Sequence, residues 1–120
     1  AGLNVLYFRA SRLFETLFQS RADGSRLKAL NRLSKVQLLI VDDFLLSPLE
    51  DAERKDFLEI IEDRYRIAST VITSQCPLEQ WHEHIGDPTI ADAICDRLFH
   101  NAFKLILKGN SLRNRKEDKE

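Results

Sequence analysis

The sequence is poor in glycine, and it lacks the glycine-rich loop with which many proteins hold phosphate groups. Its 120 residues include four isolated glycines: Gly2, Gly24, Gly86 and Gly109. No Gly-Lys-Ser or Gly-Lys-Thr occurs, so the motif G-x-x-x-x-G-K-[ST], whose backbone amides and lysine cradle phosphates, is excluded. Methionine is also absent. A chain that begins Ala1-Gly2 suits a piece of a longer protein, although removal of an initiator methionine would look the same.

Long apolar runs and paired cysteines are missing too. No apolar run reaches the roughly 18 residues that a membrane span needs, and the amino terminus lacks the basic and then apolar pattern of a signal peptide. Cys76 and Cys95 lack C-x-x-C spacing, so we expect reduced thiols rather than a disulfide. His82, His84 and His100 complete no usual zinc pattern with them. We therefore predict a soluble, cytoplasmic protein without a zinc site.

The spacing of apolar residues predicts one α/β domain. A chain of this length can bury about two-thirds of its unfolded surface. Four short apolar or β-branched runs are typical of strands: 4–8, 36–41, 69–74 and 102–107. Helical patterns separate them, which predicts a parallel sheet with right-handed crossovers and helices on both faces. In this interpretation residues 1–109 form the domain, and residues 110–120 are a polar, charged tail.

The expected helices carry clear start signals and apolar stripes. In the segment 47–50, Ser47 can cap a helix, proline can occupy its first position, and Glu50 can reach back as a capping box. Asp87 followed by proline repeats the signal. Apolar residues at helical spacing predict the core: Leu13, Phe14, Leu17, Phe18, Leu27, Leu30, Leu33, Phe57, Leu58, Ile60, Ile61, Tyr65, Ile90, Ile94 and Leu98, with Trp81 on a short helical segment. We expect the acids of the helix after residue 50 on its outer face.

Charge is segregated along the chain, although the net charge is only -1. Residues 9–35 carry seven basic side chains and two acids, whereas residues 42–63 carry nine acids and two basic side chains. Residues 104–120 are basic again. Such a division suits one surface for a polyanion and another for a metal or a protein partner. Ordinary solvated helix surfaces would give the same pattern, so both interpretations stay open.

The clearest functional signal is the run Leu-Leu-Ile-Val-Asp-Asp-Phe at residues 38–44. A continuous apolar run predicts a strand buried on both faces, and the carboxyl end of such a strand is where open α/β sheets bind ligands. Mg²⁺ prefers one or two carboxylates and keeps most of its water. We expect Asp42 to hold Mg²⁺ through a water molecule, and Asp43 to orient or deprotonate the water that attacks a γ-phosphate. Two solvated acids that merely end a strand are the alternative.

Several motifs in one order resemble AAA+ ATPases, and among them the IstB-like helper ATPases of insertion-sequence transposition. Residues 38–44 are similar to the second acidic motif of these proteins (Walker B). Three further segments carry the resemblance: TVITSQCPLEQWH (70–82), GDPTIADAICDRLFHNA (86–102) and LKGNSLR (107–113). The resemblance extends from about residue 3 to Arg113 and includes the related DnaC-like loaders of the replicative helicase. It implies a three-layer P-loop NTPase core with a parallel sheet, here incomplete.

The resemblance also implies roles for single residues. Gln75 matches the sensor that contacts the γ-phosphate or the attacking water, and an amide can both donate and accept hydrogen bonds there. Arg97 matches the arginine finger that reaches the nucleotide of a neighbouring subunit, where its fixed charge stabilises the transferred phosphoryl group. A pair with a nearby acid on the same helix is the plain alternative for Arg97. Arg113 resembles the second sensor.

Two departures from the family pattern matter. The acidic motif usually ends in Asp-Glu, so the shorter Asp43 holds its carboxylate farther from the water. The phosphate loop, with its strand and helix, precedes the segment that resembles residues 1–8 in family members and is missing here. We expect ATP and Mg²⁺ to bind the full-length protein, whereas this chain alone should bind ATP weakly or not at all and should not hydrolyse it. Without the central phosphate-loop strand, we expect the last strand to lie beside residues 70–74, or dimerisation or strand swapping to fill the gap.

The family implies partners as well. Duplex DNA would be held by a homo-oligomer, chiefly through phosphates, and Arg26, Lys28 and Arg32 are our candidates for these contacts. The protein partner would be the transposase of the same element, or a replicative helicase if the chain belongs to the loaders. A nucleotide-free interaction module is a further alternative. A phosphoacceptor receiver domain fits poorly, because the strand after the paired acids does not end in an aspartate and Lys104 precedes leucine.

Overall fold

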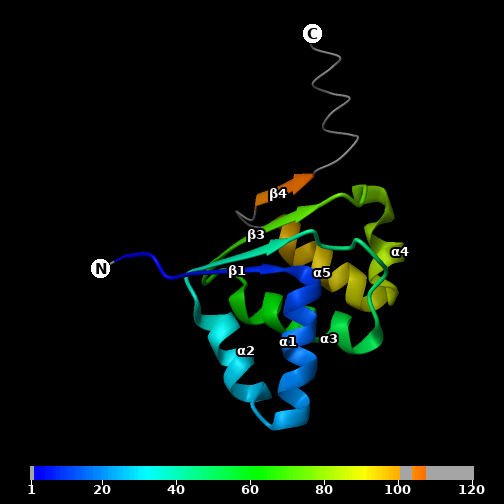
Figure 1. Cartoon of the computed structure of the whole chain (residues 1–120). Helices are drawn as coiled ribbons and strands as arrows, with labels where there is room; N and C mark the ends of the chain where they lie inside the picture. The colour runs from blue at the N-terminus through cyan, green and yellow to red at the C-terminus, as the bar shows by residue number, and fades with distance from the viewer. Residues whose placement is uncertain (1, 101–103, 108–120) are drawn as a thin grey trace.

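The four strands form one parallel sheet. The computed structural model describes residues 2–100 and, for the backbone alone, residues 104–107 (Figure 1). The strands follow chain order across the sheet: β1 (Val5–Arg9), β2 (Leu38–Asp42), β3 (Ser69–Ser74) and β4 (Lys104–Leu107). The predicted parallel α/β sheet is confirmed. This order also differs from the 2-1-3-4-5 order of flavodoxin-like folds, to which receiver domains belong.

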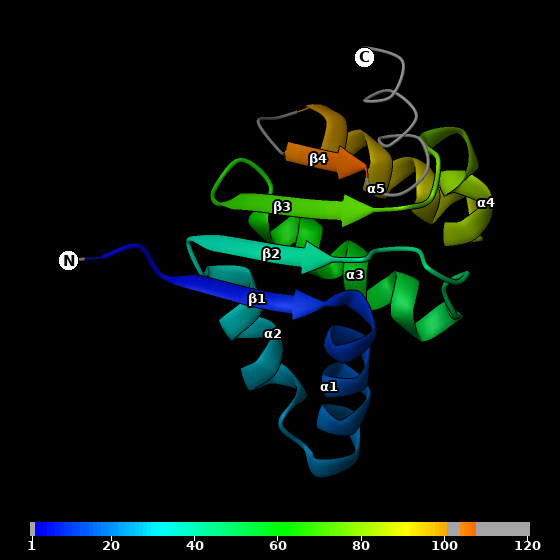
Figure 2. The same cartoon turned by 45° about the horizontal axis from the view of Figure 1, so that its top comes forward.

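The helices lie together on one face of the sheet (Figure 2). They are α1 (Ala10–Asp23), α2 (Arg26–Lys35), α3 (Asp51–Arg64), the 3-10 turn η1 (Leu78–Gln80), α4 (Trp81–Ile85) and α5 (Pro88–His100). The sequence predicted helices on both faces, and among the described residues they cover one. The reason is geometric: when strand order follows chain order, every right-handed crossover places its helix on the same side.

The uncovered face explains the burial of β2. Leu39 and Val41 are fully buried against the helices, whereas Leu38 and Ile40, which point to the opposite face, are half-buried. The prediction of a strand buried on both faces was therefore wrong for the described residues. On β1 the same open face carries Val5 and Tyr7, which are 46% and 56% exposed.

The last strand, β4, pairs with β3. This was one of the two arrangements that we predicted for a sheet without its central strand. The register runs from Val71 opposite Lys104 to Ser74 opposite Leu107. The backbone edge of β3 is thus paired within this chain. Residues 102–103 of the expected strand, the tail at 110–120 and Arg113 lie outside the described residues.

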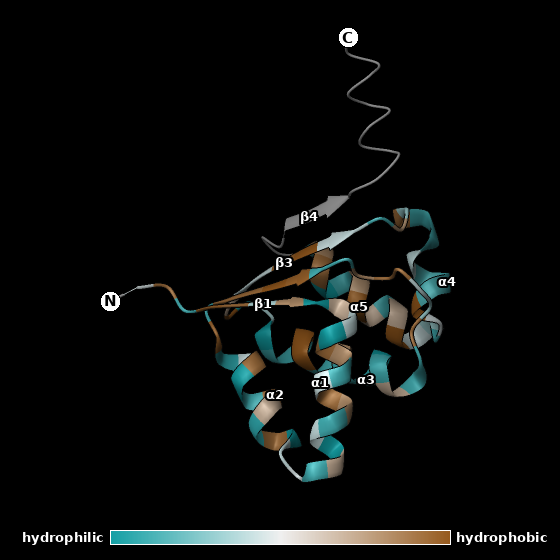
Figure 3. Ribbon diagram, viewed as in Figure 1, coloured by the Kyte–Doolittle hydropathy of each residue, from teal (hydrophilic) through white to brown (hydrophobic). Residues whose placement is uncertain are grey.

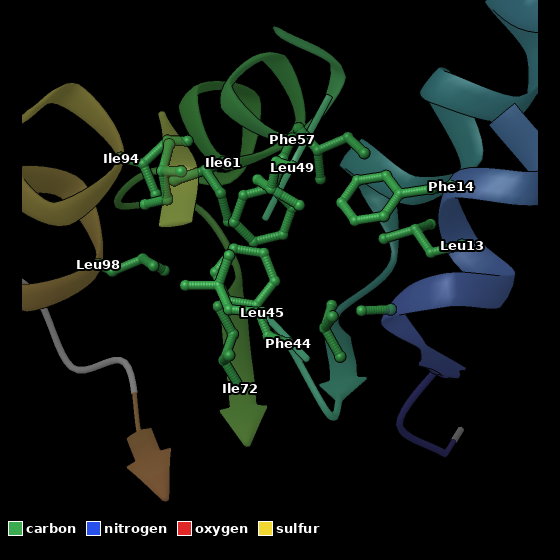
Figure 4. Close-up of a cluster of buried hydrophobic side chains, with 14 of the residues drawn as sticks. Leu13, Phe14, Phe44, Leu45, Leu49, Phe57, Ile61, Ile72, Ile94 and Leu98 are labelled. Atoms are coloured by element: carbon green, nitrogen blue, oxygen red, sulfur yellow. The ribbon is translucent and has the colours of Figure 1, made fainter. Parts of the chain in front are cut away.

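An aromatic cluster fills the space between the sheet and the helices (Figures 3 and 4). Figure 3 shows apolar residues concentrated in the strands, and Figure 4 shows Phe44 and Phe57 lying together at the centre of the core. Their rings stack with centroids 4.5 Å apart, and Trp81 meets Phe44 edge-on at 5.3 Å. Trp81 is fully buried, so its predicted core position is confirmed. This packing supports the end of β2 and the loop that follows it.

Two predicted core residues are in fact on the surface. Phe18 on α1 is 69% exposed and Leu27 on α2 is 74% exposed. Each helix contacts the core through only some of its apolar residues. Helix α1 does so through Leu13, Phe14 and Leu17, and helix α2 through Leu30 and Leu33. Spacing alone therefore overestimated the buried faces of these two helices.

Helix starts were predicted with mixed success. Helix α5 begins as expected, with the Ile90 amide donating to Asp87 Oδ1 at 3.0 Å. Helix α3 begins three residues later than predicted, because its capping box joins Glu50 and Glu53 rather than Ser47 and Glu50. The Leu49 amide instead donates to the carbonyl oxygen of His84. This tertiary hydrogen bond holds residues 47–49 in the loop before α3. Within residues 2–100 and 104–107, no helix has the length and apolarity needed to cross a membrane.

Candidate functional site

The candidate site lies at the carboxyl edge of the sheet, where β2 ends in Asp42 and Asp43. Both aspartates are half-buried, and Val41 before them and Phe44 after them are fully buried. The apolar run therefore anchors the strand and the loop in the core. The two carboxylates stand at the rim of the sheet, as the sequence predicted.

Two hydroxyl groups orient the carboxylate of Asp42. Tyr7 on β1 donates a hydrogen bond to Asp42 Oδ2 at 2.6 Å. Thr73 on β3 donates a hydrogen bond to Asp42 Oδ1. Because the donors come from the strands on either side of β2, Asp42 is bonded across three neighbouring strands.

Asp43 leaves the extended conformation directly after the strand. Its φ angle of 57° lies in the left-handed region, which aspartate tolerates better than most residues. The Asp43 amide donates to Thr73 Oγ1 at 2.9 Å, and its carboxylate lies 3.7 Å from Arg9 Nε. The Asp43 side chain is only 15% exposed. The hydroxyl of Thr73 thus bonds to both aspartates, accepting from the amide of one and donating to the carboxylate of the other.

A small pocket adjoins Asp43 between the start of α1 and the loop after β2. It measures about 140 Å³ and is lined in part by Ser11, Leu45, Ser47 and Glu53. Nucleotide-sized ligands need pockets of roughly 300 Å³ or more. The pocket can therefore take water or a small group beside Asp43, and a nucleotide would need further walls.

The oxygen donors at this edge suit a hard cation that keeps much of its water. Among residues 2–100, no group of three or more His, Cys, Asp or Glu side chains could hold a metal ion. A metal at Asp42 would therefore take most of its ligands from water and a bound phosphate. Mg²⁺ binds in this way, so the residues present fit the ion that the sequence predicted.

Gln75 follows β3 at the same edge and is exposed. The hydrogen bonds from the end of β3 to the aspartates come instead from Thr73, two residues earlier. Next to it, Ser74 donates to the Phe44 carbonyl oxygen at 2.5 Å and ties the two loops together.

Burial, helped by the negative charge of Glu79, raises the pKa of the Cys76 thiol, which excludes a reactive thiolate here near neutral pH.

Arg97 lies toward the edge of the sheet opposite the two aspartates. Helix α5 returns from the carboxyl edge to the start of β4, so Arg97, in its last turn, lies toward the amino edge (Figure 2). Its guanidinium is 3.3 Å from Glu62 and 5.7 Å from the centre of the Tyr65 ring. It also lies 3.7 Å from Asp96, so the pair with an acid on the same helix, which was the alternative for Arg97, is present. The structure therefore separates Arg97 from the Asp42 site of its own chain.

The three candidate DNA contacts on α2 have different surroundings. Arg26 Nη1 lies 2.8 Å from Asp56 Oδ1, and Arg26 Nη2 lies 3.6 Å from Glu59. Lys28 and Arg32 are exposed. Arg32 lines a groove of about 640 Å³ between α2 and the start of β1, together with Asn4, Asn31 and Lys35. Lys28 and Arg32 are thus open to solvent, whereas Arg26 is engaged within the fold.

Sequence reasoning missed Tyr7, Thr73 and Arg9. Tyr7 was read only as part of an aromatic strand, and Thr73 only as part of a β-branched one. The available signal was that each lies near the carboxyl end of a strand beside β2, where side chains meet at one rim. Which of them touch Asp42 depended on the register of the sheet.

The chain is similar to proteins of one named family. The chain matches the IstB-like ATP binding protein family over residues 1–120. It is 53% identical over 116 residues to y4pL of Sinorhizobium fredii, named as an insertion sequence ATP-binding protein, covering 97% of this chain and 47% of that protein. It is 34% identical over 119 residues to the ATP-binding protein of insertion sequence IS21 from Pseudomonas aeruginosa, covering 99% and 45%. The chain thus spans about half the length of these relatives.

The fold is also that of the AAA+ proteins. The AMPPCP-bound structure of DnaA from Aquifex aeolicus superposes with a TM-score of 0.69 at 16% identity, covering 99% of this chain and 37% of DnaA. A DnaA structure with AMPPCP and single-stranded DNA gives the same TM-score at 14% identity, covering 98% and 37%. At this identity the likeness concerns the fold alone. With the family match over its whole length and 53% identity to one member, the chain belongs to the IstB-like ATP-binding proteins.

Proposed function

We propose that this chain forms the magnesium-binding and hydrolytic part of an ATPase that assists a transposase in moving an insertion sequence. The observation that carries the proposal is the orientation of the Asp42 carboxylate by Tyr7 and Thr73 at the carboxyl edge of β2. The names of the relatives, which refer to insertion sequences and ATP binding, support the biological setting. They favour transposition over the loading of a replicative helicase.

In this proposal the residues at the rim divide the work. Asp42 accepts hydrogen bonds from the water shell of Mg²⁺, and Asp43 positions and deprotonates the attacking water. Gln75, exposed beside them, donates to a phosphate oxygen or to that water. Bound Mg²⁺ would supply positive charge beside the phosphates. The phosphate loop and the rest of the nucleotide pocket would belong to the remainder of the protein.

Arg97 acts in the neighbouring subunit of a homo-oligomer. Its location toward the opposite edge of the sheet supports this role, because it is far from the nucleotide side of its own chain. To reach a neighbour, Arg97 must exchange Glu62 for phosphate oxygens. Both partners are anionic, so the exchange requires no change in the charge of the arginine.

DNA would contact the basic surface of α2. Lys28 and Arg32 are exposed and available for phosphates, and Arg26 orders the helix through Asp56. Binding through phosphates should weaken steeply with added salt. Replacing Lys28 and Arg32 together with glutamine should reduce DNA affinity and the salt slope without changing ATP hydrolysis in the absence of DNA.

Subunit mixing tests the proposed ATPase in the full-length protein. Asp43→Asn should lower kcat by about 100-fold or more, and Arg97→Ala should abolish hydrolysis by the assembled protein. Because the two residues serve the same site from different subunits, mixing the two variants should restore part of the activity. Glu83→Gln, at an exposed acid on α4, is the matched control and should hydrolyse ATP normally.

Several outcomes would contradict the proposal. Wild-type protein that fails to hydrolyse ATP with Mg²⁺, or an Asp43→Asn variant with wild-type rates, would exclude the hydrolytic role. No recovery of activity on mixing would exclude the role of Arg97 in a neighbouring subunit. Binding to the transposase that is equally tight with and without ATP would favour the nucleotide-free interaction module.

A further inference from the structure

We infer that Tyr7 is a positioning residue for the magnesium-binding carboxylate, and that its hydroxyl group tunes the affinity of the site for Mg²⁺. This inference rests on the proposed function, since it concerns the same carboxylate. It starts from the hydrogen bond of 2.6 Å that Tyr7 donates to Asp42 Oδ2. Neither the apolar strand pattern nor the family resemblance pointed to a residue on β1.

The register of the sheet shows why tyrosine suits this position. Tyr7 lies opposite Ile40, and Arg9 lies opposite Asp42. The Tyr7 side chain must therefore reach diagonally toward the carboxyl edge, by two residues along the neighbouring strand, to meet Asp42. Diagonal neighbours on adjacent strands are within reach of aromatic and other long side chains. A shorter hydroxyl residue at position 7 would not span this distance.

Tyr7 and Thr73 bind different oxygens of the same carboxylate. Tyr7 donates to Oδ2 and Thr73 donates to Oδ1. Two donors on opposite sides hold the plane of the carboxylate, because rotation about its terminal bond would break both hydrogen bonds. An ionised carboxylate has about four lone-pair positions, and these two hydroxyl donors do not fill all of them by themselves. In our proposal the carboxylate also accepts hydrogen bonds from water that surrounds a cation.

The donor on β1 matters because Mg²⁺ tolerates little deviation from octahedral geometry. Partners that orient a metal-binding side chain typically change metal affinity by 10-fold to 100-fold when they are removed. Thr73 is buried and also accepts the Asp43 amide, so its loss would disturb both aspartates. Tyr7 is 56% exposed, so Tyr7→Phe removes a hydrogen-bond donor to Asp42 without disturbing the buried core.

A purely structural role for Tyr7 makes a different prediction. In that case the hydrogen bond would only tie β1 to β2, and its loss would lower stability without changing metal binding. Val5 offers a matched control, because it lies on the same strand and the same open face with 46% exposure and has no polar side-chain atom. Val5→Ala should alter the surface of the strand and leave Asp42 untouched.

The experiment measures nucleotide binding, not hydrolysis, in the full-length protein. The affinity for a fluorescent ATP analogue is determined with and without Mg²⁺ for wild type, Tyr7→Phe and Val5→Ala. We expect Tyr7→Phe to bind the metal-free nucleotide like wild type and to lose about tenfold of the gain in affinity that Mg²⁺ provides. Val5→Ala should keep the whole gain. Mn²⁺ titration followed by electron paramagnetic resonance should show the same weakening for Tyr7→Phe.

The two possible failures can be told apart. If Asp42→Asn loses the Mg²⁺ effect and Tyr7→Phe retains all of it, the role of Tyr7 is overturned and the proposed function stands. If wild-type protein and Asp42→Asn respond equally to Mg²⁺, Asp42 is not the magnesium residue and both proposals are overturned. A lower thermal unfolding temperature for Tyr7→Phe with an unchanged Mg²⁺ response would establish the structural role instead.

Discussion

The two edges of the sheet each hold a charged side chain in a network of hydrogen bonds, and the two networks differ in kind. At the amino edge, Arg64 is completely buried. It donates to the Thr70 hydroxyl and to four backbone carbonyl oxygens, those of Leu33, Val36, Gln37 and Ser69. At the carboxyl edge, Asp42 is half-buried, and its network includes the hydroxyl groups of Tyr7 and Thr73.

This difference in hydrogen bonding distinguishes a charged side chain that stabilises the fold from one that can take part in ligand binding or catalysis. A guanidinium has five N–H donors, and Arg64 makes five hydrogen bonds, so its capacity is used within the protein. Burial lowers the pKa of Arg64 from its ordinary value, yet a guanidinium remains charged in proteins. Asp42 is oriented on two sides and is half-buried at the rim of the sheet, where the proposed ligand would bind. A saturated, buried charge supports the fold, whereas an oriented carboxylate at the rim can serve chemistry.

The largest expected effect comes from breaking the amino edge. Arg64→Leu should lower the free energy of unfolding by about 3 kcal/mol or more, because it removes the buried hydrogen bonds to the carbonyl oxygens of Leu33 and Val36 and to the Thr70 hydroxyl. Urea unfolding measures the loss. Arg66→Gln removes an exposed arginine two residues away and should cost well under 1 kcal/mol. Equal losses for the two variants would show that the Arg64 network has no special weight.

A second buried charged residue, Asp56, has arginines as partners where Arg64 has carbonyl oxygens. Comparing the two tests whether both kinds of partner stabilise the fold equally. Asp56 is 2% exposed and lies 2.7 Å from Arg21 and 2.8 Å from Arg26, which come from α1 and α2. It is also the exception to our prediction that the acids of α3 face outward. Asp56→Asn should cost about 2 kcal/mol, less than a fully buried pair because both arginines are about one-third exposed.

Salt distinguishes the two kinds of network. In high salt the cost of Asp56→Asn should shrink, since the partly exposed ion pairs are screened. The cost of Arg64→Leu should stay nearly the same, since its partners carry no net charge. A cost of Arg64→Leu that falls with salt as steeply as that of Asp56→Asn would contradict this account.

Gly86 tests another arginine, Arg54, which also binds backbone carbonyl oxygens. Arg54 donates to the carbonyl oxygens of Ile85 and Leu49, and to the Asp51 carboxylate at 3.0 Å. Gly86 has a φ of 104°, and a Cβ atom there would lie 2.6 Å from Arg54 Nη2. Gly86→Ala should therefore cost about 1 to 3 kcal/mol, from backbone strain and from displacement of Arg54. In an Arg54→Ala background the cost should fall to the backbone part, and an unchanged cost would exclude the contact with Arg54.

The smallest effect on stability is expected at the carboxyl edge. Thr73→Val removes the hydroxyl group that joins Asp42 and Asp43, and it should cost about 1 kcal/mol. Thr73→Ser keeps the hydroxyl and should restore most of this loss. If Thr73→Val destabilised the protein as much as Arg64→Leu, the carboxyl edge would be a structural network like the amino edge.

How far the sequence predicted the fold depended on how local each signal was. The strand at 69–74 and the start of α5 at Asp87 were predicted correctly, because β-branched runs and proline after a capping residue act through the local backbone. The predicted start of α3 was wrong, because a hydrogen bond from the Leu49 amide to the carbonyl oxygen of distant His84 holds the preceding loop outside the helix. The predicted burial of Phe18 and Leu27 was wrong, because the packing of the helices, and not the spacing of apolar residues, decides which apolar side chains are covered.

The candidate site was predicted in part for the same reason. Asp42 and Asp43 follow a continuous apolar strand, so their place at the rim could be read from adjacent residues. Their partners could not, because Tyr7 and Thr73 come from other strands, 35 and 31 positions away from Asp42. Gln75 and Arg97 were named through family resemblance, and the structure shows one exposed at the same rim and the other toward the opposite edge.

The sequence by itself determined a parallel α/β domain and paired carboxylates at the end of an apolar strand, because hydrophobic periodicity and strand ends are properties of neighbouring residues. Only the tertiary structure decided that the described helices share one face, that Arg64 is saturated at one edge, and that Tyr7 and Thr73 orient Asp42 at the other. These features depend on strand order and register, which bring together groups far apart in the chain.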